Sequence, residues 1–339
     1  MTITEARPVR SARRHQLIGL SAAFGIGMLV AIQSRLNGEL GGRLGDGVAA
    51  ALISFGSGLI ILLIGCALIP RVRGGLLRVW HTIRGPVDGL PGSMPGAGHG
   101  GLRWWQCIGG IAGAFLVATQ SITVAVIGVA VFTVAVVAGQ ALSSLVVDKL
   151  GFGPAGSQPF TPLRVIGAVV ALAAVALAVS DQLDHPSGLL LAILPAVGGI
   201  GTAFQQAING RVARTASPDA YGAVAAAVVN FVVGTVALAI VFLVDLALRG
   251  APRDLPTEPW LYVGGACGVA FISLAAAVVR VVGVFVLGLG TIAGQLIASL
   301  AIDIFLPAAD NPVTVLVVAG TLLALVAVVV AAIPNLRRF

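Results

Sequence analysis

Residues 139–148 read Gly-Gln-Ala-Leu-Ser-Ser-Leu-Val-Val-Asp, and residues 294–303 repeat the pattern as Gly-Gln-Leu-Ile-Ala-Ser-Leu-Ala-Ile-Asp. Gly, Gln, Ser and Asp recur at the same spacing, 155 positions apart, inside apolar runs. At about 100° per residue, the Gln, Ser and Asp of each copy fall along one stripe of a helix. A polar stripe on a helix surrounded by lipid must face protein or water. The two stripes therefore predict an interior surface, lined by Gln140, Ser144, Asp148, Gln295, Ser299 and Asp303.

The composition is that of an integral membrane protein. The hydrophobic fraction is 58%, the charged fraction 10% and the mean hydropathy +1.04, whereas a soluble chain needs more charge to cover its surface. The net charge of +7 lies in short segments between apolar runs, which is typical of topogenic loops and does not require nucleic acid. Cys66, Cys107 and Cys267 are isolated, so neither a metal site nor a disulfide framework is expected. The basic N-terminal segment precedes an apolar stretch without a convincing cleavage site, which favours a retained first span.

Apolar runs of about 20 residues predict ten membrane spans. They cover residues 17–37, 48–69, 104–122, 124–147, 163–180, 188–209, 222–247, 260–279, 281–304 and 313–334. Tight turns are expected near Ile122–Val124 and at Arg280. Residues 85–103 are rich in Gly and Pro and are predicted to form a flexible linker, with a binding loop as the alternative.

The distribution of basic residues predicts that both termini are cytoplasmic. With ten spans, sixteen of the 20 Lys and Arg residues then fall on the inner side, as the positive-inside rule requires. The four on the outer side are Arg35, Arg43, Arg249 and Arg253. The outer loops instead collect acidic residues, namely Asp181, Asp184, Asp254, Glu258 and Asp310.

The repeat extends over both halves of the chain. Gln33, Asn37 and Gly38 match Gln205, Asn209 and Gly210 at an offset of 172; Ser54, Phe55 and Gly58 match Asn230, Phe231 and Gly234 at 176; Trp105, Gly109, Gly110 and Gly113 match Trp260, Gly264, Gly265 and Gly268 at 155. The order is the same throughout, so two copies of a five-span unit are expected. The predicted organisation is a cytoplasmic segment 1–16, a first repeat 17–180, a second repeat 188–334 and a cytoplasmic tail 335–339.

Because five is odd, the second copy must enter the membrane from the opposite side. The two halves are then related by a pseudo-twofold axis in the membrane plane, which is the architecture of alternating access. Gln33 and Asn37 are expected near the outer surface, and Gln205 and Asn209 near the inner one. Asp148 and Asp303 are expected at opposite faces.

Ten spans, the inverted repeat and the paired Gly-Gln-x-x-x-Ser-x-x-x-Asp motif resemble the YdcZ-like branch of the drug/metabolite transporter (EamA-like) superfamily. The resemblance covers about Leu17 to Pro334. It implies a central cavity lined by the first, third and fourth spans and their second-half counterparts, with the fifth and tenth peripheral. It also implies export of amphipathic metabolites, amino acids, bases, sugars or toxic compounds. The superfamily's small multidrug exporters have a glutamate in the first span; this chain has Gly27, Met28 and Ala31 there, which argues against proton-coupled cation export.

The candidate binding residues are neutral. Gln offers two donors and one acceptor, so paired glutamines can hold a hydrogen-bonding solute without placing a charge in the bilayer. The alternative is that these polar groups only bridge helices. The candidates for lining the cavity are Gln140, Ser144, Gln295, Ser299, Gln33, Asn37, Gln205, Asn209 and Asn230. Asp148 and Asp303 are candidates for gating or coupling, although a carboxylate that stays hydrated at the end of a span is the plainer interpretation.

Enzyme chemistry is not expected. The four His residues are scattered through loops, and no phosphate-binding loop motif occurs, so no catalytic residues, metal or cofactor are predicted. Two hypotheses remain. One is a secondary transporter of small neutral, zwitterionic or amphipathic metabolites or drugs, with export as the expected direction; the other is a non-transporting assembly or sensing module with the same fold. The expected partners are the lipid bilayer of the inner membrane and a small-molecule substrate but no nucleic acid, with a homodimer left open.

Overall fold

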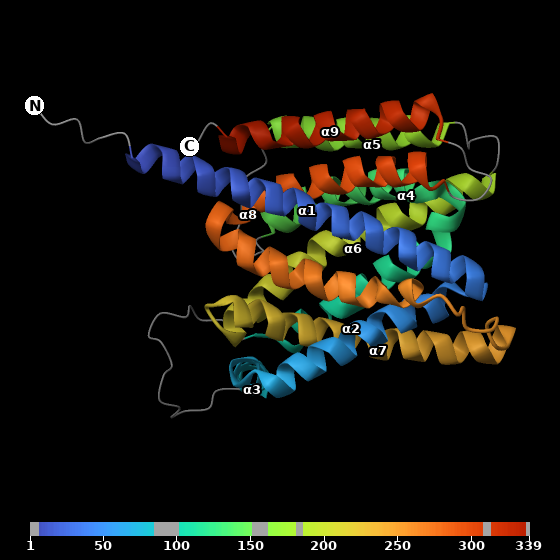
Figure 1. Ribbon diagram of the computed structural model, residues 1–339, viewed down its shortest axis with the longest axis horizontal. Helices are drawn as coiled ribbons and strands as arrows, with labels where there is room; N and C mark the ends of the chain where they lie inside the picture. Colours follow the sequence, from blue (N-terminus) through green and yellow to red (C-terminus); the bar gives the residue numbers. More distant parts are fainter. Residues whose placement is uncertain (1–6, 85–101, 151–161, 181–185, 308–312, 337–339) are drawn as a thin grey trace, which may run out of the picture.

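The computed structural model describes residues 7–84, 102–150, 162–180, 186–307 and 313–336, and these residues are helical apart from short connections. The long helices run in the same general direction and form one bundle (Figure 1). In chain order they are α1 (Arg7–Leu44), α2 (Gly47–Leu68), α3 (Pro70–Arg84), α4 (Gly109–Lys149), α5 (Pro162–Val179), α6 (Pro186–Ala216), α7 (Ala220–Arg249), α8 (Gly264–Phe305) and α9 (Val315–Leu336). Short 3-10 helices, η1 (Trp104–Cys107) and η3 (Pro259–Val263), precede α4 and α8.

Five helical segments of the described chain are long and apolar enough to cross a membrane: Ile18–Leu44, Gly47–Leu68, Trp104–Val147, Leu191–Ala216 and Ala220–Arg249. Shorter apolar segments are Val165–Ala178, Pro259–Ala275, Gly290–Phe305 and Val315–Val330. The third long segment has 44 residues, which would make a straight helix about 66 Å long. That length is about twice the hydrocarbon core of a bilayer, so this segment has to bend.

The bend in α4 is at Gly128. Its φ of 78° and ψ of 166° are not helical, and a residue without a Cβ adopts them at low cost. Gly198 faces Leu116 and Gly199 faces Val136, so the parts of α4 before and after the bend both pack on α6. The turn expected near Ile122–Val124 is therefore wrong by a few residues, because Ile122 and Val124 are still helical.

Helix α8 doubles back in the same way. Gly264 faces the side chain of Asn37, and Gly294 faces the carbonyl group of Phe24. A straight helix from Gly264 to Gly294 would be about 45 Å long, whereas Phe24 and Asn37 are only about 20 Å apart along α1, so α8 cannot be straight. Figure 1 shows α8 as two antiparallel parts. The side chain of Arg280, predicted to mark this turn, lies outside the described residues.

Helix α1 is longer than expected. The predicted span ends at residue 37, whereas α1 continues to Leu44. Pairs at i,i+4 that join Glu39 to Arg35 and Arg43 support these additional turns. Asn37 is fully buried among the helices, and its expected depth near the outer membrane surface stays a prediction.

Helix α3 was not predicted. It occupies the start of the connection between the second and third predicted spans, and residues 85–101 of the expected linker lie outside the described part of the chain. Figure 1 shows α3 nearly end-on at the end of the bundle where α2 finishes, so α3 lies across the direction of the long helices.

Glycines permit the closest helix contacts. A Cβ at Gly294 would lie 2.0 Å from the carbonyl oxygen of Phe24, and a Cβ at Gly139 would lie 1.9 Å from that of Ala196. These contacts bring α1 against α8 and α4 against α6. Helices α2 and α7 meet through the rings of Phe55 and Phe231, whose centroids are 4.8 Å apart. Helices α5 and α9 form a pair at one side of the bundle (Figure 1).

Candidate functional site

The backbones of Gln140 and Gln295 lie at two close helix crossings. A Cβ at Gly27 would be 2.0 Å from the carbonyl oxygen of Thr291 and 2.7 Å from the nitrogen of Gln295. A Cβ at Gly199 would be 2.1 Å from the carbonyl oxygen of Val136 and 3.1 Å from the nitrogen of Gln140. Each glutamine is therefore held against a helix from the other half of the chain.

The two glutamine side chains differ from the two serines in their hydrogen bonding. Gln295 is 7% exposed and Gln140 is half-buried, and neither side chain forms a hydrogen bond with another described residue. The serines behave differently. Ser144 Oγ donates to the carbonyl oxygen of Ala141 and Ser299 Oγ to that of Leu296, both at 2.9 Å. Since these bonds stay within one helix, the serines do not bridge helices through their donors.

A buried polar cluster joins α1 to α4. Asn37 Nδ2 donates to Gln120 Oε1 at 2.8 Å, and Gln120 Nε2 donates to Ser34 Oγ at 3.0 Å. Asn37 Oδ1 and Ser54 Oγ have no hydrogen-bond partner among the described residues, and both face Gly264. Buried polar atoms are usually paired. These two unpaired atoms are therefore candidate acceptor and donor groups for a bound solute.

The second half carries a corresponding cluster between α6 and α7. Gln205 Nε2 and Asn209 Nδ2 both donate to Asn230 Oδ1, at 2.8 and 3.1 Å. Gly109 lies against Asn209 and Gly113 lies against Gln205. In the first half Gln33 takes the matching place beside Gly268. The structure thus brings Gln205, Asn209 and Asn230 together as one network.

Asp303 closes the bend in α4. Its Oδ1 accepts a hydrogen bond from the backbone N–H of Val129 at 2.9 Å, and its Oδ2 accepts one from Ala130 at 2.6 Å. These are the first N–H groups after Gly128, so the carboxylate caps the second part of α4. Asp303 is 5% exposed. The expectation of a hydrated carboxylate at the end of a span is wrong for Asp303, and the side chain of Asp148 lies outside the described residues.

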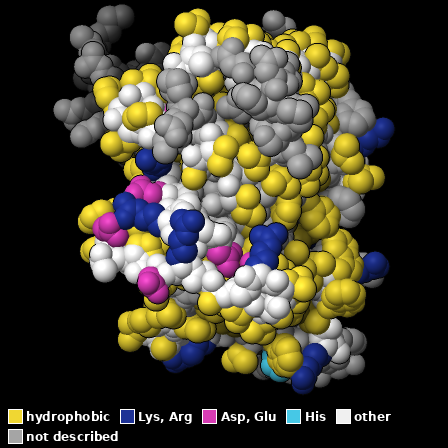
Figure 2. Space-filling model, turned by 90° about the vertical axis from the view of Figure 1, so that its right-hand side faces the viewer, with side chains coloured by type: hydrophobic (Ala, Val, Ile, Leu, Met, Phe, Trp, Pro, Cys, Tyr) yellow, Lys and Arg dark blue, Asp and Glu magenta, His cyan; other side chains and the backbone are white. Residues whose placement is uncertain are grey.

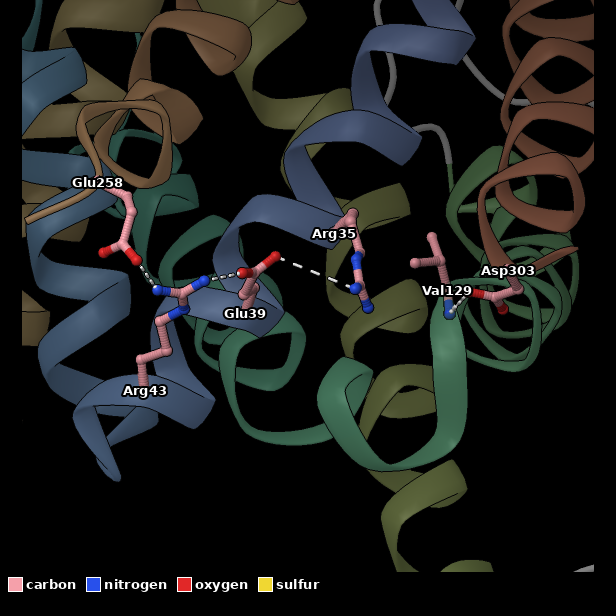
Figure 3. Close-up of polar contacts among 6 residues, drawn as sticks. All are labelled: Arg35, Glu39, Arg43, Val129, Glu258 and Asp303. Atoms are coloured by element: carbon pink, nitrogen blue, oxygen red, sulfur yellow. Dashed lines mark hydrogen bonds and ion pairs between the residues drawn. The ribbon is translucent and has the colours of Figure 1, made fainter. Parts of the chain in front are cut away.

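A chain of ion pairs runs from this region to the end of α1 (Figure 3). Arg43 donates to Glu39 at 2.6 Å and also to Glu258, and Arg35 lies 4.0 Å from Glu39. The hydrogen bond from Arg43 lowers the pKa of Glu258 from its ordinary value of 4.5. Figure 2 views this end of the molecule and shows basic and acidic side chains gathered on it. The pair Arg43–Glu258 ties α1 to the segment before η3.

The family model described as "Putative inner membrane exporter, YdcZ" matches residues 18–177 and, a second time, residues 190–330. These matches cover nearly the whole chain. The chain belongs to the YdcZ family. This drug/metabolite transporter-type family is described as one of inner-membrane exporters, and the described chain has several helices long and apolar enough to cross a membrane. The chain is therefore a multi-pass inner-membrane protein of a transporter family. No curated protein matches the chain.

Family membership confirms the resemblance inferred from the paired motif, and it leaves the site residues as predictions. Among the described residues, no three His, Cys, Asp or Glu side chains are grouped so that they could hold a metal ion. Two members of the α1–α4 cluster, Ser34 and Gln120, were not among the predicted site residues. Gln120 lies within a polar run of Thr119, Gln120 and Ser121 in an apolar span. That run is the sequence feature that could have identified Gln120 as a member of the cluster.

Proposed function

We propose that this YdcZ-family chain exports small neutral, zwitterionic or amphipathic solutes by alternating access between two inverted five-helix halves. The observation that carries the proposal is the double match of one family model, once in each half of the chain. Two copies of one unit with an odd number of spans have opposite orientations in the membrane. The proposed halves are residues 17–180 and 188–334, with residues 1–16 and 335–339 on the cytoplasmic side.

Matched contacts support this symmetry. Gly27 against Gln295 and Gly199 against Gln140 are counterparts under the sequence offsets of 172 and 155. Gly264 against Asn37 and Gly109 against Asn209 are counterparts as well. Phe55 and Phe231 are repeat partners that contact each other, as expected of residues beside a twofold axis. Helix α3 is not a proposed span. The bends divide α4 and α8 into two spans each, and with the other six helices this gives ten proposed spans.

The proposed site is lined by amides. Among the described residues, the side-chain amides of Gln140 and Gln295 have no hydrogen-bond partner, and neither has Asn37 Oδ1. Amides donate and accept hydrogen bonds without a charge, which suits a solute with both donors and acceptors. Asp303 is the proposed gating residue, because its carboxylate holds the bend of one half from a helix of the other.

The test is solute flux in proteoliposomes. A panel of neutral amino acids, nucleosides and sugars is first screened for solutes that raise the melting temperature of the purified protein, because a ligand of the native state stabilises it by mass action. Radiolabelled forms of the solutes found are then followed across the membrane. The double variant Gln140→Ala with Gln295→Ala is expected to lose most of the flux.

Gln206→Ala is the matched control, because Gln206 is exposed on α6 next to Gln205 and its loss is expected to leave flux unchanged. Undiminished flux in the double variant would refute the glutamine site. Failure of every solute in the panel both to stabilise the protein and to cross the membrane would count against transport of this solute class.

A further inference from the structure

Helix α3 is basic, amphipathic and placed across the end of the bundle (Figure 1). Its sequence, Pro70–Arg84, contains four Arg residues, one His and one Trp but no acid. Helices of this composition lie in the interface between lipid and water. Trp favours that depth because its ring is apolar while its N–H is polar.

One face of α3 is firmly attached to the bundle. Val72 and Val79 are buried, and Gly75 fits against Ala216 and Ala225. Arg78 Nε donates to the carbonyl oxygen of Ala216 at 2.7 Å, which satisfies an end of α6. The helix is therefore a fixed part of the fold.

The other face of α3 forms one wall of an apolar groove of about 730 Å³. Leu77 and Trp80 from α3, Cys66 from α2 and Val229 and Val232 from α7 line it, and Arg73 is the one cation among its described lining residues. Leu77 is 58% exposed and Trp80 51%, so the groove opens outward. Farther along α7, the exposed residues Val236, Ile240 and Val244 continue the apolar face that starts at the groove. In a membrane, lipid chains cover such a face.

Arg73 supplies the polar end of this groove. Its side chain is exposed, and one guanidinium N–H is bonded to the carbonyl oxygen of Ala67 at the end of α2. A guanidinium has five N–H donors, so several remain for a phosphate, which Arg binds well. At the far end of the same face, Arg84 stacks on Trp80 with its guanidinium carbon 4.0 Å from the ring centroid.

We propose that the groove between α3 and α7 binds an anionic phospholipid of the membrane, with its phosphate on Arg73 and one acyl chain between Trp80 and Val232. The argument is charge complementarity together with an apolar channel that continues onto the lipid-facing side of α7. This site lies outside the proposed transport site and does not depend on it.

The experiment measures the fluorescence of Trp80. Trp104, Trp105 and Trp260 are replaced by Phe, and the purified full-length protein is reconstituted in vesicles containing brominated phosphatidylglycerol or brominated phosphatidylcholine. Bromine quenches a nearby Trp, so quenching reports lipid in the groove. At 0.5 M NaCl, where long-range attraction is screened, phosphatidylglycerol is expected to quench Trp80 at a lower mole fraction than phosphatidylcholine.

Arg73→Gln is expected to weaken the preference for phosphatidylglycerol about tenfold, the effect of losing one charge-assisted hydrogen bond. Arg71→Gln is the matched control: it removes the same charge from the same helix, but Arg71 lies over the ring of Tyr221 and does not line the groove. The preference of the Arg71→Gln variant for phosphatidylglycerol is expected to stay within twofold of that of the protein with Trp80 as its one Trp. Val232→Phe fills the groove and should reduce quenching by both lipids.

Three results would overturn the proposal: equal quenching by the two lipids, equal losses in the Arg73 and Arg71 variants, or unchanged quenching in Val232→Phe. Equal losses would mean that α3 attracts anionic lipid only diffusely. Melting curves and gel filtration of each variant verify that it is folded before the lipid titration.

Discussion

Asp303 makes a contact between residues 174 positions apart. Its carboxylate accepts hydrogen bonds from two of the N–H groups that the bend at Gly128 leaves without helical partners. A Cβ at Gly128 would lie 2.7 Å from Asp303 Oδ2, so the glycine and the aspartate fit one another. Gly128 provides the backbone conformation, and Asp303 compensates the N–H groups that this conformation exposes.

Asp303→Asn is expected to destabilise the protein by about 1–3 kcal/mol, because an amide has one acceptor oxygen and directs its NH₂ at the second N–H. The measurement is the unfolding midpoint in a denaturing-detergent titration. Asp245→Asn is the control, since Asp245 forms a 3.2 Å ion pair with exposed Arg249 and such pairs contribute about 0–1 kcal/mol. A loss no larger than the control's would show that the cap is unimportant.

The ion pair between Glu258 and Arg43 is expected to make the stability of the protein depend on pH. The pKa of Glu258 is lowered from 4.5 by the hydrogen bond from Arg43, so the native state favours the carboxylate. The stabilisation is complete above the unfolded pKa and is lost as the pH falls through the lower folded pKa. Wild type and Glu258→Gln are expected to differ in melting temperature at pH 7 and to converge as the pH drops below about 4.5.

Asp254→Asn, a change in the same connecting segment, serves as the comparison for that experiment. Its melting temperature should differ little from that of wild type at pH 7. If the gap between wild type and Glu258→Gln persists at low pH, the ion pair with Arg43 is not its source.

At the scale of helices, the packing of α1 against α8 depends on one face of α1. Gly27 faces the backbone of Thr291 and Gln295, whereas a Cβ at Gly25 would meet nothing within 4 Å. The two glycines are two positions apart and therefore lie on different faces of the same helix. Of these two glycines, only Gly27 lies at the crossing of α1 and α8.

Gly27→Ala is expected to lower the melting temperature by several degrees and to reduce any flux, because the added methyl group overlaps the carbonyl oxygen of Thr291 and must push α8 away. Gly25→Ala is expected to be neutral or slightly stabilising, since alanine favours helix over the unfolded chain. Thermal melting of both variants in detergent is the measurement. Equal effects of the two substitutions would contradict the close crossing.

For the whole molecule, topology follows from where the charges lie. The basic segments predict that both termini, α3 and the end of α4 are cytoplasmic. The connection between α7 and η3 is then exposed to the outside. This orientation remains a prediction, and accessible single cysteines can test it.

In a variant without Cys66, Cys107 and Cys267, Thr257→Cys is expected to react with a membrane-impermeant thiol reagent in intact cells. Lys149→Cys is expected to react only after the membrane is opened. Both positions are exposed on the molecule, so a difference in labelling reports the side of the membrane. The reverse pattern would invert the predicted orientation.

Much of the helical organisation was predictable because hydropathy and residue spacing are properties of the chain itself. Apolar runs of membrane-spanning length, the basic segments between them and the paired motifs at Gln140 and Gln295 require no coordinates. The positions of turns were less accurate. A long, mostly apolar stretch such as residues 104–147 contains several glycines, and hydropathy does not distinguish the one at which the helix bends.

The sequence by itself determined the membrane class, the family and the polar residues that recur in both halves. Only the tertiary structure decided that Asp303 caps the bend at Gly128, that Asn37 joins Gln120, and that α3 lies across the end of the bundle. The physical reason is that hydropathy acts on each segment separately, whereas a hydrogen bond requires two groups within about 3 Å. Which distant segments come that close depends on how all the helices pack.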